Sequence, residues 1–356
     1  MSWLTDYSAA AALSDQLVEH PKHTLLLAAG LMGEAGSVVA EIKKKERETT
    51  AYPVYRQRLS EEVGDFLWYY VRLADTLDSK LLTELSFSPA SSETTDGSVE
   101  SSVEFVIAVS DLLRVVQDKE LKGLKEGLSE LWTKLEAVSS LGHVDLVEAA
   151  RANLKKTQSR WPERKEFASL FDEKLSGEEQ LPRTMTLEFV ERKRGARTEV
   201  ILRANGINVG DRITDNIADS DAYRYHDIFH VAHAVFLGWS PIVRSLLRCK
   251  RKSVPQTDEN EDGARAGIIE EAVSAIVFSR AKNMNFFENL AQVDYDLLKT
   301  IQEFVEGYEV SRVPVWQWEL AIREGYRVFR LLRAHAGGRI FWDLTERRLE
   351  WLGEAS

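Results

Sequence analysis

Carboxylate side chains gather in two segments of the first quarter of the chain. Glu34 lies in GLMGEAGSVVAEIKKK, and Glu61, Glu62 and Asp65 lie in LSEEVGDFLWYY. Residues three positions apart share one face of a helix, so Glu62 and Asp65 can point at the same spot. Their neighbours are largely apolar, and burying several carboxylates there is costly unless a cation neutralises them. Mg²⁺ suits this role, because it takes oxygen ligands and bridges to phosphate groups.

Glycines flank these acids at Gly33, Gly36 and Gly64. A glycine inside a helix costs roughly 1 kcal/mol relative to alanine, so three of them favour two helices that approach closely. Taken singly, each acid also fits a solvated helix face with lysine partners among residues 43–45. The set of acids, glycines and flanking apolar runs favours a metal site shared by two helices.

A second group of candidate ligands lies in DAYRYHDIFHVAHAVFLGWSP. His226, His230 and His233 are four and three residues apart, so a helix places them on one stripe, with Asp227 at its edge. Two histidines at this spacing can bind one metal ion from a single helix.

A second helix, GARAGIIEEAVSAIVF, places Glu270 and Glu271 in an otherwise apolar environment. Histidines and acids on facing helices can build a metal centre inside a bundle. The alternative is structural, with the histidines hydrogen-bonded to carboxylates that hold the domain together.

The acidic segments resemble the MazG-like, all-α nucleoside triphosphate pyrophosphohydrolase family. That family carries E-x-x-E on one helix, E-x-x-D on the next, and N-x-x-K on a later helix that ends in R-[WFY]-P. The third element is present here as Asn153-Leu154-Lys155-Lys156, followed by Arg160-Trp161-Pro162. Residues 83–141 separate the second and third elements, and we interpret them as an insertion that leaves the core intact.

One position departs from the family pattern. The second member of the first pair is Ser37 instead of glutamate. Serine is a neutral and weaker ligand, so the site loses one negative charge. Glu41 can compensate, or Ser37 can act through a water molecule.

The resemblance implies hydrolysis of (deoxy)nucleoside triphosphates to the monophosphate and pyrophosphate, with water attacking the α-phosphate. It also implies Mg²⁺ as cofactor, for which Mn²⁺ can substitute, and a homodimer or tetramer. The metal ligands on this interpretation are Glu34, Ser37, Glu41, Glu62 and Asp65. The catalytic acids are Glu34, Glu61, Glu62 and Asp65. Glu61 or Glu41 would orient or deprotonate the attacking water.

Substrate contacts are expected from the residues Lys44, Trp68, Asn153 and Lys156. A lysine ammonium suits a phosphate oxygen, and an asparagine can hold a ligand or a sugar hydroxyl. One of Trp68, Tyr69 and Tyr70 can stack on a base, although core packing better explains at least two of them.

The second half resembles a C-terminal domain fused to some MazG-like proteins, through the blocks YRYHDIFH, GWSP, KRKS and EDGARA. No activity follows from this resemblance. The candidate second metal site in this half consists of His226, Asp227, His230, His233, Glu270 and Glu271. The basic triplet at 250–252 fits a solvated turn better than a phosphate contact.

Two alternatives to hydrolysis stay open. In the first, the missing acid at Ser37 weakens metal binding enough that the chain is a nucleotide-binding sensor without turnover. In the second, a metal-dependent activity centres on the histidine cluster, and the first half is a dimerisation scaffold.

The elements that position these residues are mainly helices, because apolar residues recur at three- and four-residue spacing. The expected helices span residues 7–18, 25–42, 55–77, 103–116, 121–138, 144–159, 222–236, 241–248, 264–281, 295–307 and 315–333. A β-hairpin is expected from 187–190 and 199–202, with a final β element within 337–351. The predicted fold class is mainly α: an N-terminal all-α bundle plus a helical C-terminal domain with a small β-hairpin.

The domain boundaries follow from composition. We expect a first domain over residues 1–162, with a serine-rich linker over 86–102 inside the insertion. A polar linker over 163–185 precedes the second domain, over 186–356.

The whole-chain composition narrows the classes of protein. The 356 residues are 44% hydrophobic and 29% charged, as in ordinary globular proteins. A net charge of −11 argues against stable nucleic-acid binding, and no apolar run predicts a membrane segment or a secretory signal. The single cysteine, Cys249, fits a cytoplasmic protein.

Overall fold

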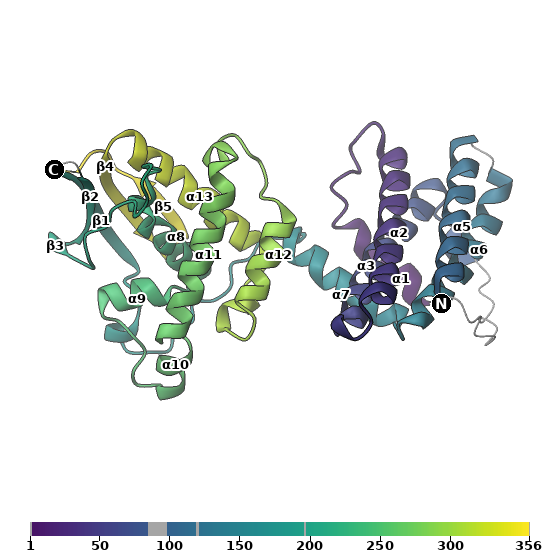
Figure 1. Ribbon diagram of the computed structural model, residues 1–356, viewed down its shortest axis with the longest axis horizontal. Helices are drawn as coiled ribbons and strands as arrows, with labels where there is room; N and C mark the ends of the chain where they lie inside the picture. Colours follow the sequence, from purple (N-terminus) through teal and green to yellow (C-terminus); the bar gives the residue numbers. More distant parts are fainter. Residues whose placement is uncertain (1, 85–97, 119–120, 196, 356) are drawn as a thin grey trace. The chain divides into compact units, whose positions relative to one another are not determined.

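The computed structural model describes residues 2–84, 98–118, 121–195 and 197–355. The chain forms two compact units, Met1–Arg164 and Lys165–Ser356 (Figure 1). Helices dominate both units, and one antiparallel sheet accompanies them in the second. The predicted class, mainly α, is confirmed.

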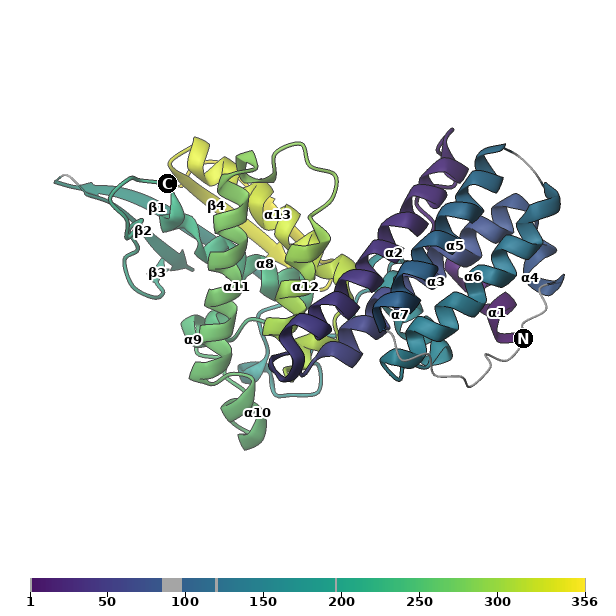
Figure 2. The same cartoon turned by 45° about the vertical axis from the view of Figure 1, so that its right-hand side comes forward.

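The first unit is a helical bundle. Helix α2 packs against α3 and α5, and α3 also contacts α7 (Figure 2). The core is built from one apolar face of each helix, with Leu31 and Val38 from α2 and Val63 and Phe66 from α3 fully buried. The helices are α1 (Ser2–Ala12), α2 (His23–Glu48), α3 (Tyr55–Leu77), α4 (Leu81–Glu84), α5 (Ser98–Asp118), α6 (Leu121–Leu141) and α7 (Leu146–Arg160).

Helix α1 ends earlier than the expected 7–18, because a buried carboxylate interrupts the pattern. Asp15 accepts a hydrogen bond from the Leu17 amide at 2.9 Å. It also pairs with His23 at 2.9 Å and with Arg72 at 3.1 Å. These contacts hold residues 13–22 in turns between α1 and α2.

Among the described residues, one segment has the length and hydropathy of a membrane span, His23–Ala51, which contains α2. The expectation that no apolar run predicts a membrane segment is therefore corrected for this segment. Leu27, Leu31, Ala35 and Val38 on this helix are buried in the core of the bundle. One face of α2 therefore belongs to this core.

Within the insertion, the described residues 98–118 and 121–141 form α5 and α6, which contact each other. Of the expected linker 86–102, residues 86–97 lie outside the described part of the chain. Residues 98–102 form the first turn of α5 rather than a linker, because the small side chains of Ser101 and Ser102 fit against neighbouring helices and are buried. The inserted helices join the core through Phe105 and Leu128.

Helix α7 begins and ends where the sequence indicates. The carboxylate of Asp145 caps its start by accepting hydrogen bonds from the Val147 and Glu148 amides at 2.8 and 3.0 Å. The helix ends at Arg160, directly before Trp161-Pro162, as the proline predicts.

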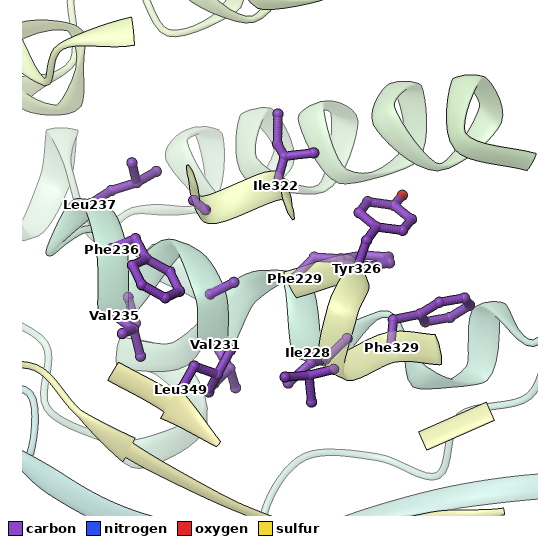
Figure 3. Packing of buried hydrophobic residues seen from close by; sticks show 14 of the residues in the cluster. Ile228, Phe229, Val231, Val235, Phe236, Leu237, Ile322, Tyr326, Phe329 and Leu349 are labelled. Carbon is purple, nitrogen blue, oxygen red and sulfur yellow. The ribbon is translucent and has the colours of Figure 1, made fainter. Parts of the chain in front are cut away.

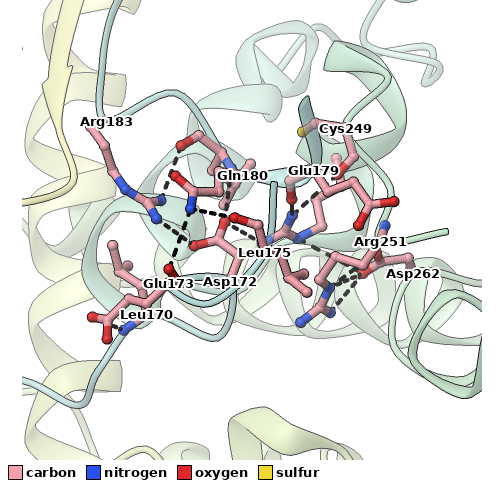
Figure 4. Close-up of polar contacts among 12 residues, drawn as sticks. Leu170, Asp172, Glu173, Leu175, Glu179, Gln180, Arg183, Cys249, Arg251 and Asp262 are labelled. Atoms are coloured by element: carbon pink, nitrogen blue, oxygen red, sulfur yellow. Dashed lines mark hydrogen bonds and ion pairs between the residues drawn. The ribbon is translucent and has the colours of Figure 1, made fainter. Parts of the chain in front are cut away.

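Residues 165–185, expected as a linker, pack within the second unit. Leu181 lies in its core, and Asp172 is only 1% exposed. Asp172 pairs with Arg183 at 2.8 Å and with Arg244 at 2.7 Å (Figure 4). The expectation of a linker is therefore wrong for these residues. Their polar composition does not reveal which charged side chains form buried ion pairs.

The same network explains the basic triplet at 250–252. Arg251 is 1% exposed and pairs with Asp262 at 2.7 Å and Glu309 at 2.6 Å. The expectation of a solvated turn is wrong for this residue, since the buried Arg251 is paired with two carboxylates. After the triplet, Pro255–Asn260 forms a short helix, α10.

The second unit combines helices with a five-stranded antiparallel sheet in the order β3-β2-β1-β4-β5. Its helices are α8 (Asp227–Leu237), α9 (Pro241–Leu247), α10, α11 (Ala264–Lys282), α12 (Tyr295–Phe304) and α13 (Val315–Ala334). Its strands are β1 (Thr184–Arg194), β2 (Arg197–Ala204), β3 (Ile207–Asn208), β4 (Gly337–Asp343) and β5 (Arg348–Trp351). The expected hairpin is β1–β2, and the sheet exceeds it because β4 pairs with β1.

Helix α8 is the centre of this unit and is buried along its whole length. Phe229 stacks on Tyr326 of α13 with ring centres 4.4 Å apart, and Phe329 lies beside them (Figure 3). Gly325 permits this approach, since a Cβ there would lie 3.0 Å from the Cβ of Ala232. The histidines of α8 are therefore held on a rigid element.

Candidate functional site

Three carboxylates of the first unit converge as the sequence predicts. Ligand oxygens of Glu34 on α2 and of Glu62 and Asp65 on α3 all lie within 4.8 Å of one another. The three side chains are partly buried. Oxygen donors from two helices therefore surround one spot, a donor set that a hard divalent cation prefers.

Helix α7 fixes the position of Asp65. The Asn153 amide donates to Asp65 Oδ1 at 2.7 Å, and Lys156 Nζ donates to Asp65 Oδ2. Asn153 Oδ1 in turn accepts from the Tyr7 hydroxyl at 2.9 Å. The N-x-x-K element thus contacts the acidic cluster, although more than eighty residues separate the two in sequence.

The glycines have unequal roles. A Cβ on Gly64 would lie 2.8 Å from the carbonyl oxygen of Ala149 and 3.1 Å from the Cβ of Asn153, so this glycine lets α3 approach α7. A Cβ on Gly33 or Gly36 would meet no atom within 4 Å. The expectation of close helix packing is confirmed for Gly64 and is wrong for the other two.

Burial and charge repulsion make the site hold a proton near neutral pH. Burial first, and then the carboxylates of Asp65 and Glu62, raise the pKa of Glu34 to about 7. Burial also raises the pKa of Asp65, although Lys156 and Asn153 oppose the shift. A bound cation would offset the repulsion among the carboxylates. The arrangement therefore favours binding of a positive charge.

Glu61 lies at the edge of the cluster. Its Oε1 is 3.6 Å from Lys156 Nζ, and its Oε2 is 3.7 Å from Arg58 Nη1. Lys156 therefore lies between Glu61 and Asp65. This position leaves Glu61 next to the three candidate ligands but not among them.

Two other predicted residues contact Tyr52. Glu41 accepts a hydrogen bond from Tyr52, and Lys44 lies over the Tyr52 ring, 4.0 Å from its centre. Ser37 is half-buried on α2, and its role as a ligand stays a prediction. The structure thus gives Tyr52 as the partner of Glu41 and Lys44.

Two of the three consecutive aromatic residues belong to the core, as expected. Trp68 is 8% exposed and donates to Ser14 Oγ at 3.1 Å, and Tyr70 donates to the Leu128 carbonyl oxygen at 3.0 Å. Trp68 is therefore occupied by packing rather than presented to a base. Tyr69 is half-buried, and its pKa is raised by burial and then by Glu34 and Asp65.

Sequence reasoning missed Tyr7 and chose Trp68 over Tyr69. Nothing in the local sequence marks Tyr7, because its role depends on a contact with Asn153 across the bundle. Helical spacing alone could have favoured Tyr69, which lies four residues after Asp65 and so shares its face.

The histidine cluster of the second unit also comes together. His230 Nδ1 lies 3.1 Å from Glu270 Oε1, and His230 Nε2 lies 3.4 Å from Glu271 Oε1. His226 Nε2 lies 3.9 Å from Asp227 Oδ1 and 3.8 Å from Glu271 Oε2. Two overlapping groups have ligand atoms within 4.8 Å of one another: His226, Asp227 and His230; and His230, His233 and Glu270.

Glu270 is the anchor of this cluster. It is fully buried, and its Oε1 accepts from Ser240 Oγ at 2.7 Å and from His233 Nδ1 at 3.1 Å. Its Oε2 accepts from the backbone amide of Ile242 at 3.0 Å. The start of α9 and His233 of α8 thus fix this carboxylate against His230.

Burial and neighbouring charges shift the pKa values of several residues in this cluster. Burial alone would lower the pKa of His230, but Glu270 and Glu271 outweigh it and raise this pKa. Burial lowers the pKa of His226 and raises the pKa of Asp227. Strongly shifted groups gathered at one place are typical of functional sites, and also of structural ion pairs.

A cleft of this unit lies away from the histidine cluster. It has a volume of about 690 Å³ and is bordered by Met185, Ile207, Leu246 and Cys249. None of its lining residues belongs to the histidine cluster.

Comparison with known families shows which family the second unit matches. The model of the MazG C-terminal domain matches residues 166–355, which is more than half of the chain. The chain belongs to this family. No curated protein and no solved structure matches the chain significantly.

The MazG C-terminal domain coincides with the second structural unit, whose boundary lies at Lys165. The match therefore includes β1 to β5, the buried α8 and the histidine cluster. This membership makes the chain a MazG-like protein and indicates a nucleotide-related function.

Proposed function

We propose that the chain hydrolyses (deoxy)nucleoside triphosphates to the monophosphate and pyrophosphate, with Mg²⁺ held in the first unit. The observation that carries this proposal is the convergence of Glu34, Glu62 and Asp65 within 4.8 Å, from two helices. Membership in the MazG C-terminal domain family and the N-x-x-K contact to Asp65 support it.

The residues fit a divalent cation by their chemistry. Glu34, Glu62 and Asp65 offer only oxygen atoms. Burial first, and then the charges of Asp65 and Glu62, raise the pKa of Glu34 although Lys156 opposes the shift. When bound, Mg²⁺ would neutralise the triphosphate and polarise its phosphoryl oxygens, and Mn²⁺ can substitute.

Lys156 and Asn153 act on the position of the reacting groups. Asn153 holds Asp65 by a bond of 2.7 Å, and Lys156 bonds the other oxygen of Asp65. On substrate binding, Lys156 turns one N–H toward a phosphate oxygen. The carboxylates of Glu61 and Asp65 lie beside the Lys156 ammonium.

Glu61 is the proposed base. It lies beside the cluster, 3.6 Å from Lys156 Nζ, without belonging to the three converging ligands. Its carboxylate accepts the proton of the attacking water, whose oxygen forms a bond to the α-phosphorus. The bond between the α-phosphorus and the bridging oxygen breaks, and pyrophosphate leaves.

The test is a panel of canonical and modified NTPs and dNTPs with the full-length protein, with and without Mg²⁺. We expect a monophosphate and pyrophosphate in the presence of Mg²⁺ and a loss of at least about 100-fold in Glu62→Gln. Glu130→Gln is the matched control, because Glu130 is an exposed acid on α6 of the same unit. His230→Ala should retain the activity.

Two other outcomes would replace the proposal. Nucleotide binding without turnover in any member of the panel would favour the sensor alternative, in which Ser37 weakens the metal site. Turnover that survives Glu62→Gln and disappears in His230→Ala would place the activity in the second unit.

The oligomeric state and the partners remain predictions. A homodimer or tetramer, with no membrane association and no stable nucleic-acid binding, is expected for the full-length chain. Light scattering coupled to gel filtration measures the first, and binding assays with vesicles and oligonucleotides measure the others.

A further inference from the structure

One residue of the histidine cluster lacks the hydrogen bonds that a buried imidazole needs. His230 is fully buried, and neither of its ring nitrogens makes a hydrogen bond. Carboxylate oxygens lie only 3.1 and 3.4 Å away, but neither contact has hydrogen-bond geometry. A structural imidazolium would direct its N–H groups at these oxygens. The proposed hydrolysis does not use this residue.

His226 presents its free nitrogen to the same place. His226 Nδ1 lies 3.0 Å from the Tyr223 carbonyl oxygen. A carbonyl only accepts, so Nδ1 carries the proton and Nε2 keeps a lone pair. The ring is also stacked on Tyr223, with centres 4.5 Å apart and planes 2° from parallel. A backbone carbonyl that fixes the tautomer is typical of metal-binding histidines.

The distances among the donors suit one metal ion. His226, Asp227 and His230 offer atoms within 4.8 Å of one another, and Glu271 lies 3.4 and 3.8 Å from the two Nε2 atoms. Bonds of about 2.1 Å in a tetrahedral shell separate neighbouring donors by about 3.4 Å. The donors therefore need only small adjustments to share an ion.

Glu270 does not belong to the ligands. Its two oxygens already accept from Ser240, His233 and the Ile242 amide. Its Oε1 faces His230 Nδ1 at 3.1 Å, on the far side of the ring from Nε2. A carboxylate behind a ligating histidine orients the ring and makes it a better donor. This role distinguishes the two overlapping groups.

We infer that the second unit holds one divalent first-row transition-metal ion, bound by His226, Asp227 and His230 with Glu271 as a fourth donor. Imidazole with carboxylate suits Zn²⁺, Mn²⁺, Fe²⁺ or Ni²⁺, whereas Mg²⁺ prefers oxygen ligands alone. The Glu271 side chain is 43% exposed, so an ion can reach the site from solvent on that side. The site is separate from the acidic cluster of the first unit.

The test uses metal-stripped, full-length protein in excess Mg²⁺, which occupies the acidic cluster. Co²⁺ is the probe, because its visible spectrum reports ligand type and geometry, and Zn²⁺ displaces it. We expect one Co²⁺ per chain. Binding should weaken by at least about tenfold in His226→Gln and in Glu271→Gln. His335→Gln and Glu306→Gln are matched controls, since both residues are exposed in the same unit.

The outcomes separate a metal site from a structural ion pair. No Co²⁺ binding in excess Mg²⁺, or binding unchanged in both ligand variants, would overturn the inference. If circular dichroism shows that His226→Gln does not fold, Glu271→Gln decides, because its side chain is substantially exposed. Glu62→Gln should lose hydrolysis and keep Co²⁺ binding, so either proposal can fail without the other.

Discussion

Asn153 connects two distant parts of the first unit through one side chain. Its amide nitrogen donates to Asp65 at 2.7 Å, and its amide oxygen accepts from Tyr7 at 2.9 Å. Asn153 is 4% exposed, so water cannot replace either bond easily. A buried polar group that loses its partner costs about 1–3 kcal/mol.

We predict that Asn153→Ala lowers the free energy of unfolding of the first unit by about 2–3 kcal/mol, because Asp65 and Tyr7 both lose a partner. Urea unfolding followed by circular dichroism measures this change. Tyr7→Phe is the control: it removes only one of the two bonds and should cost about 1 kcal/mol. Equal effects of the two variants would contradict the bridging role of Asn153.

Asp172 provides a pH-dependent contribution in the second unit. Burial alone would raise its pKa, but Arg183, the Leu181 amide and Arg244 lower it overall. A carboxylate whose pKa is lower in the folded state stabilises the fold above its unfolded value of about 3.9. This contribution is lost as the pH falls through the lower folded value.

Asp172→Asn should therefore reduce the free energy of unfolding by about 3 kcal/mol at pH 7, since the buried Arg244 loses the nearer of its two carboxylate partners, Asp172 and Asp262. The difference from the parent protein should shrink as the pH falls below the unfolded value of about 3.9. Denaturant melts at several pH values measure both effects. Glu178→Gln, at an exposed acid nearby, should change little. A difference that does not depend on pH would contradict the ion-pair explanation.

At the scale of elements, the contact between α3 and α7 brings the N-x-x-K element to the acids. Gly64 lies at this contact. A Cβ atom on Gly64 would lie 2.8 Å from the carbonyl oxygen of Ala149. Backbone cannot move away as a flexible side chain can. The spacing between the two helices therefore depends on one missing methyl group.

We predict that Gly64→Ala destabilises the first unit by about 1–3 kcal/mol, because it forces α3 and α7 apart. Gly33→Ala is the matched control on α2, where a Cβ meets no atom within 4 Å. That change should stabilise the helix by roughly 0.5–1 kcal/mol, by the difference in helix propensity. Thermal melts of both variants measure the difference, and stabilisation by Gly64→Ala would contradict the packing argument.

At the scale of the whole molecule, the chain has two separate hydrophobic cores. One core lies within residues 4–150 and contains Phe66, and the other lies within 181–349 and contains Phe329. Both side chains are fully buried. Each unit therefore has the packing that it needs to unfold as a cooperative body.

Calorimetry of the full-length protein should show two unfolding transitions. Phe66→Ala should destabilise only the first unit, and Phe329→Ala only the second, each by about 3–5 kcal/mol. The two variants act as controls for each other. A single transition that both substitutions lower by the same amount would show that the units unfold together.

The chain's local patterns determined its class and many of its elements. Helical periodicity found most helices, Pro162 marked the end of α7, and the segments 187–190 and 199–202 predicted the β1–β2 hairpin. The spacing of Glu62 and Asp65, and of His226 and His230, identified both clusters. These features follow from local geometry, which neighbouring residues in sequence specify.

Only the tertiary structure decided which partners meet across the chain. In the tertiary structure β4 pairs with β1, and Arg251 is buried between Asp262 and Glu309. Glu41 and Lys44 both contact Tyr52. The tertiary structure also brings Tyr7 to Asn153, and Glu270 to the back of His230. Such contacts join residues far apart in sequence, and their energies depend on burial and geometry that no local pattern contains.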